Sequence, residues 1–212
     1  MIINLILNPK EFFSKVVEHP ANLKIPFIII LVFGFSIFFQ SSLPYIRFLN
    51  YIPDTGDRVV VLILFTMFFV FGILVSFLLW IVLSTIFWVV IKIIFKKTRD
   101  FKKTLEVVSY GFLPLIFGNV IYSIVWFICM LNIPHEILHI VQNHPQYILA
   151  ASTLVVSKEV SYLLMIIIIL SHLWSSLLWA EGLKQLFNVR FLKVLVITVA
   201  LSLVWVSFYI LI

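Results

Sequence analysis

Long apolar runs separated by short charged stretches make up most of this chain. Five of the runs are long enough to cross a hydrocarbon core of about 30 Å as helices. They lie at about 25–42, 59–94, 112–133, 160–180 and 191–212. The second run has no proline or paired glycine at which to turn back, so we predict one helix of about 54 Å there. The pattern predicts an all-α membrane protein, a bundle of five transmembrane helices.

Two shorter segments have one apolar and one charged face. The first begins with Asn8, Pro9 and Glu11, which are typical of a helix start, and its two faces continue over 9–18. The segment 100–108, which begins with an aspartate as a candidate N-cap, has the same pattern. We predict that both are interfacial amphipathic helices lying in the headgroup layer.

The composition restricts the class of protein. Hydrophobic residues form 63% of the chain and charged residues 11%, which excludes a soluble globular protein because too few polar groups remain to cover its surface. Residues 1–212 show no internal repeat and no soluble segment, so we predict a single transmembrane domain.

Lysine and arginine are distributed unevenly among the loops. Three precede the first span, six lie between the last residues of the second span and the start of the third, and three lie between the end of the fourth span and the first residues of the fifth, whereas the opposite side has three. Loops rich in lysine and arginine stay in the cytoplasm. We therefore predict a cytoplasmic N-terminus and, after five crossings, an extracytoplasmic C-terminus. The net charge of +6 reflects this distribution, and we expect no nucleic-acid partner.

The loop between the second and third spans holds the densest group of cations. Beside an amphipathic helix, such cations could bind anionic lipid headgroups, each contributing about 1 kcal/mol. An alternative is that the charges only set the topology. The candidate lipid contacts are Lys96, Lys97, Arg99, Lys102 and Lys103.

A His-Glu-x-x-His motif follows the third span, on the side that the charge distribution places outside. In zinc proteases two histidines with this spacing hold the metal and the glutamate activates its water. Here His135 and His139 would be ligands, Glu136 the catalytic base, and His144 the nearest third ligand. The alternative is the polar face of a helix resting on the membrane, with no catalytic residue and no cofactor.

Two polar residues lie inside predicted spans. His172 is near the middle of the fourth span, and Asn119 lies in the third. Polar groups at such depth face the bundle interior or a wet cavity. They could form an interhelical hydrogen bond that holds the bundle together. Alternatively, the chain is a small permease or a transport accessory subunit with a cavity near His172.

Two motifs resemble those of the Yip domain family, the Ypt- or Rab-interacting membrane proteins and their prokaryotic relatives. The first is the Asn-Pro-x-x-Phe-Phe helix that begins at Asn8. The second is Ser109-Tyr110-x-x-x-Pro114, in which serine replaces the glycine of the eukaryotic motif. The resemblance implies a structural or partner-binding integral membrane protein, involved in membrane organisation or trafficking and without known chemistry. Its partners would be membrane lipids and other membrane proteins or a second copy.

Overall fold

The computed structural model describes residues 2–48, 55–131, 136–137 and 156–211, and all regular structure in them is helical. The predicted all-α membrane fold is confirmed. The helices are α1 (Ile2–Leu7), α2 (Pro9–Glu18), α3 (Lys24–Phe48), α4 (Thr55–Phe95), α5 (Phe101–Tyr110), α6 (Leu113–Leu131), α9 (Lys158–Phe187) and α10 (Phe191–Leu211).

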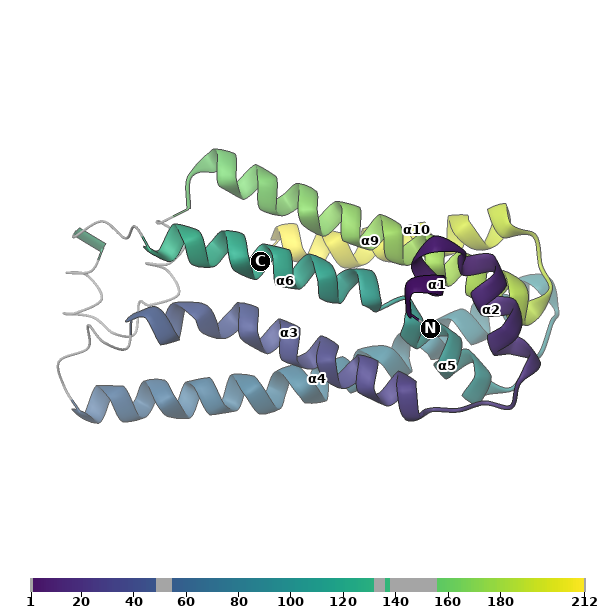
Figure 1. The fold of residues 1–212 in the computed structure, drawn as a ribbon, viewed down its shortest axis with the longest axis horizontal. Helices are drawn as coiled ribbons and strands as arrows, with labels where there is room; N and C mark the ends of the chain where they lie inside the picture. Colours follow the sequence, from purple (N-terminus) through teal and green to yellow (C-terminus); the bar gives the residue numbers. More distant parts are fainter. Residues whose placement is uncertain (1, 49–54, 132–135, 138–155, 212) are drawn as a thin grey trace.

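Five long helices form the bundle. The helices α3, α4, α6, α9 and α10 run along the long axis, whereas α1, α2 and α5 gather at one end (Figure 1). We call this end, with the exposed loop 96–100, the basic end. By length and apolarity α3, α4, α9 and the stretch 101–131 could each cross a membrane, and α10 adds a shorter apolar helix.

The helix α4 is continuous from Thr55 to Phe95, so the long apolar run forms one helix and not two. It packs along α3, where Gly34 allows the two backbones to approach closely. It also packs against α5, and most of its remaining surface is exposed and apolar, as a face in contact with lipid tails should be.

The helix α9 extends seven residues past Ala180, where the sequence pattern places the end of the fourth span. Leu183, Leu186 and Phe187 are fully buried, and this stretch of α9 belongs to the same core as α2 and α5. Asn188 then ends the helix in the left-handed conformation, with φ of 51°. The extension gives the basic end a protein core of its own beyond the apolar spans.

Candidate functional site

The two segments that carry the family resemblance meet at the basic end. The ring centroids of Phe12 and Tyr110 are 4.9 Å apart, edge to face, and Phe13 lies 6.2 Å from the same tyrosine. Tyr110 is only 3% exposed. Pro114 is buried in the first turn of α6, where its missing N–H breaks no helical hydrogen bond. Three motif residues, Phe12, Phe13 and Tyr110, therefore form one aromatic cluster between α2 and α5.

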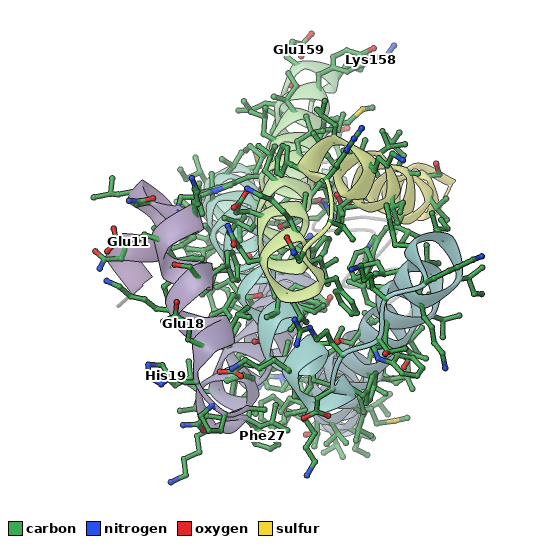
Figure 2. The ribbon with its side chains drawn as sticks, turned by 90° about the vertical axis from the view of Figure 1, so that its right-hand side faces the viewer. Glu11, Glu18, His19, Phe27, Lys158 and Glu159 are labelled. Atoms are coloured by element: carbon green, nitrogen blue, oxygen red, sulfur yellow. The ribbon has the colours of Figure 1, made fainter. Side chains whose placement is uncertain are left out.

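The start of α2 is capped as its sequence predicts. The backbone N–H of Glu11 donates to Asn8 Oδ1 over 3.4 Å, and Asn8 Nδ2 donates to Glu11 Oε2 over 2.9 Å. Lys15 Nζ donates to Glu11 Oε1 over 2.6 Å, and this hydrogen bond lowers the pKa of the exposed Glu11 carboxyl. Figure 2 shows Glu11 on the outer side of α2.

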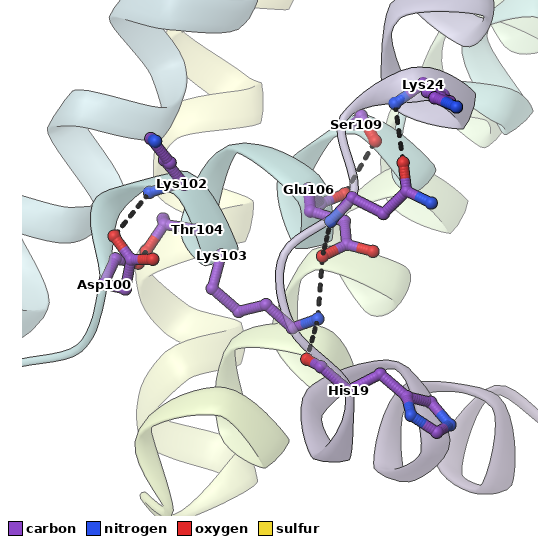
Figure 3. Close-up of polar contacts among 9 residues, drawn as sticks. His19, Lys24, Asp100, Lys102, Lys103, Thr104, Glu106 and Ser109 are labelled. Atoms are coloured by element: carbon purple, nitrogen blue, oxygen red, sulfur yellow. Dashed lines mark hydrogen bonds and ion pairs between the residues drawn. The ribbon is translucent and has the colours of Figure 1, made fainter.

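A buried ion pair holds α5 against the segment between α2 and α3 (Figure 3). Lys103 Nζ lies 2.7 Å from Glu106 Oε2 and donates to the carbonyl of His19 over 2.8 Å. The backbone N–H of Asn22 donates to the same Glu106 oxygen over 3.2 Å. Both side chains are only 7% exposed. Two charges on α5 therefore fix a segment more than 80 residues away in sequence.

The helix α5 covers the segment 100–108, for which an interfacial amphipathic helix is predicted. The helix forms and Asp100 caps it, and its residues from Lys103 to Tyr110, except the half-buried Leu105, are buried in the protein. Lys103 is among the predicted lipid contacts. This part of the prediction is wrong, because the Lys103 ammonium is buried in the ion pair with Glu106 and is not accessible to a lipid headgroup. The other four candidates, Lys96, Lys97, Arg99 and Lys102, are exposed.

Three tryptophan side chains support the same end, and the sequence analysis does not single them out. A tryptophan indole N–H that is wholly or partly buried usually finds an acceptor, so tryptophans near the ends of the spans are a usable signal. Each one donates to a backbone carbonyl of α5 or of the loop before it. The bonds are Trp80 Nε1 to Leu105 O (2.8 Å), Trp88 Nε1 to Arg99 O (2.9 Å) and Trp179 Nε1 to Val108 O (2.7 Å).

The two predicted intramembrane polar residues serve different pairs of helices. His172 is buried, its Nδ1 lies 2.9 Å from the carbonyl of Ile168 on α9, and its ring lies 6.1 Å from that of Trp205 on α10. Asn119 Nδ2 on α6 donates to Ser36 Oγ on α3 over 3.0 Å. Asn119 therefore joins α6 to α3, while the ring of His172 lies against α10.

A hydrogen-bonded seam joins α9 to α10 beside His172. Ser176 Oγ lies 2.6 Å from Ser202 Oγ, and Thr198 Oγ1 donates to the carbonyl of Ser176 over 3.0 Å. All three side chains are buried. Such hydrogen bonds stabilise contacts between helices where apolar burial gives little driving force.

The predicted zinc ligands lie outside the residues that the structure describes. This applies to His135, His139 and His144, whereas Glu136 is exposed in a short helical stretch. In the described parts of the chain no three histidine, cysteine or acidic side chains are grouped to hold a metal ion. Zinc binding at the His-Glu-x-x-His motif stays a prediction.

Comparisons with known proteins agree with the fold. A family model described as Yip1 domain matches residues 3–212. An uncharacterized protein of Methanocaldococcus jannaschii is 32% identical over 123 residues, which cover 57% of this chain and 84% of that protein. No solved structure matches.

Proposed function

Because the chain belongs to the Yip1 domain family, and is thus a multi-pass integral membrane protein, we propose that it acts without chemistry of its own and organises membranes or membrane traffic. We propose that its basic end binds anionic lipid headgroups and, through them, membrane partners. The observation that carries this proposal is the exposed cation group Lys96, Lys97, Arg99 and Lys102.

These four side chains are not neutralised by neighbouring carboxylates. Among the described residues the ion pairs involve Lys15, Lys103 and Lys184, and none involves the exposed cation group. The one acid beside them, Asp100, accepts the backbone N–H of Lys102 as the cap of α5. These cations are thus available to bind an external anion, and the buried helix α5 holds them in place.

The proposal places the basic end in the cytoplasm, and cysteine labelling tests this orientation. In a chain carrying Cys129→Ser, Lys97→Cys should be shielded from an impermeant reagent in intact cells, because basic loops are retained inside. Asn143→Cys should be labelled. Equal labelling after permeabilisation is the control for reactivity. The reverse pattern in intact cells would overturn the orientation.

Loss of the exposed cations should release anionic lipid. For the triple variant Lys97→Gln, Arg99→Gln, Lys102→Gln we expect the affinity for phosphatidylglycerol to fall roughly 100-fold, at about 1 kcal/mol per cation. The measurement is the number of lipids that stay bound to the purified protein in native mass spectrometry. Lipid binding of this kind should also weaken at high salt because the sites are exposed.

The matched control removes three other exposed cations, Lys10, Arg190 and Lys193, by the same substitution to glutamine. It changes the net charge equally but leaves the exposed cation group intact. Equal lipid loss from the two triple variants would mean that net charge alone attracts the lipid, and the proposed site would be abandoned.

A further inference from the structure

A cavity of about 810 Å³ opens at the basic end, between α2, the segment 19–23 and the start of α3. The apolar part of its wall includes Phe12, Val16, Leu23 and Ile25. A space of this size is large enough for a lipid headgroup with its glycerol. Nothing in the proposed role of the exposed cation group uses it.

Two polar groups of α5 face this cavity. Glu106 and Tyr110 line it, although both side chains are more than nine-tenths buried. The Oε2 atom of Glu106 is taken by Lys103 and Asn22, but no hydrogen bond within the described chain reaches Oε1 or the Tyr110 hydroxyl. An ionised carboxylate oxygen accepts hydrogen bonds and donates none. The cavity therefore offers acceptors to a ligand that carries N–H donors.

Cations stand at the edge of the same cavity. Lys15 and Lys24 line it and are exposed. Lys15 is paired with Glu11 on the surface, whereas no ion pair in the described part of the chain involves Lys24. An acceptor oxygen inside and a free ammonium outside complement a ligand with an amine at one end and a phosphate next to it.

The surface around the cavity is that of a membrane-inserted protein. Apolar side chains near it are exposed, with exposed fractions of 77% for Leu7, 53% for Phe27 and 58% for Ile28. Figure 2 shows Phe27 and His19 on neighbouring parts of the outer edge of the molecule. A ligand whose apolar tail continues along the exposed face of α3 would bury these side chains.

We propose that this cavity binds one phospholipid whose headgroup carries a primary amine. The ammonium donates to Glu106 Oε1 and to the Tyr110 oxygen, the phosphate lies at Lys24, and the acyl chains follow the apolar start of α3. The site shares no residue with the exposed cation group, so each of the two proposals can fail without the other.

The test compares two lipids with the same acyl chains and net charge. Phosphatidylethanolamine has N–H donors and phosphatidylcholine has none, so native mass spectrometry of the full chain should find the first bound about tenfold more tightly. Tyr110→Phe, which keeps the ring against Phe12, should reduce this preference about two- to tenfold by removing one acceptor. Lys24→Gln should weaken both lipids, whereas Lys10→Gln should weaken neither.

Three results would overturn the proposal. The first is equal binding of the two lipids, and the second is tighter binding of phosphatidylglycerol that persists in the variant Lys97→Gln, Arg99→Gln, Lys102→Gln, which would indicate a site for anions in the cavity. The third is displacement of the lipid by an equal concentration of soluble phosphoethanolamine, which would show that the acyl chains contribute nothing. A melting temperature like that of the unmodified protein shows that Tyr110→Phe is folded, and the exposed Lys24→Gln gives an independent readout.

Discussion

Lys103→Met is expected to reduce the free energy of unfolding by about 3–5 kcal/mol, because it leaves the Glu106 carboxylate buried without its cation. The pair lies at 2.7 Å with both side chains 7% exposed, so solvent screens it little. Methionine keeps most of the side-chain volume, which limits the change to the charge and the hydrogen bond to His19 O. Thermal unfolding of the purified protein in detergent, followed by tryptophan fluorescence, measures the loss.

The neighbouring Lys102→Met is the matched control, since Lys102 is exposed and forms no ion pair in the described chain. The double variant Lys103→Met, Glu106→Met should recover part of the stability, because it removes the uncompensated charge along with the pair. If Lys103→Met melts at the same temperature as Lys102→Met, the buried pair does not stabilise the fold.

The spans could be predicted from the sequence because an apolar run of about 20 residues is typical of a helix that crosses the bilayer. The run over 59–94 shows this well, since it lacks a turn signal and forms the single helix α4. The burial of α5 could not be predicted in the same way. A ten-residue helix with one apolar face has the same pattern on a membrane surface and beneath a protein layer.

The candidate site depends on contacts that lie far apart in the sequence. Lys103 and Glu106 three residues apart indicate only a common exposed helix pair. Their burial requires the chain from His19 to Asn22 to fold back over α5, which neither segment signals alone. The surroundings of His172 are likewise only partly predictable from the sequence. Its depth in the span is evident from the sequence, but its neighbour α10 is chosen by packing.

Part of the family motifs could be predicted, because some motif residues contact only their neighbours in the sequence. Asn8, Pro9 and Glu11 act locally, so the sequence identifies the cap of α2 without knowledge of the fold. The contact between Phe12 and Tyr110 brings these two distant motifs together in the fold. Motif residues here hold helices in place at the basic end, and two of them, Phe12 and Tyr110, also line the cavity.

Close packing at the basic end leads to the second large effect, which concerns two glycines. A Cβ added at Gly111 would overlap the indole of Trp179, and one added at Gly182 would lie 2.6 Å from Val107 Cγ1 and 2.9 Å from Phe13 Cε1. Overpacking of this kind costs about 1–3 kcal/mol. Gly111→Ala would also displace the indole from its 2.7 Å hydrogen bond, adding about 0.5–1.5 kcal/mol.

Gly72→Ala is the control for these glycine variants, because it introduces the same methyl group into a helix of the same protein. Its added Cβ would lie 3.4 Å from the nearest atom, the carbonyl oxygen of Gly34, which is an ordinary contact. Alanine also favours a helix over glycine by about 0.5–1 kcal/mol, so this variant should melt at or slightly above the temperature of the unmodified protein. Gly111→Ala and Gly182→Ala should melt clearly below it. If all three variants have the same melting temperature, the basic end is not closely packed. It would then not form a rigid support for the exposed cation group and the cavity.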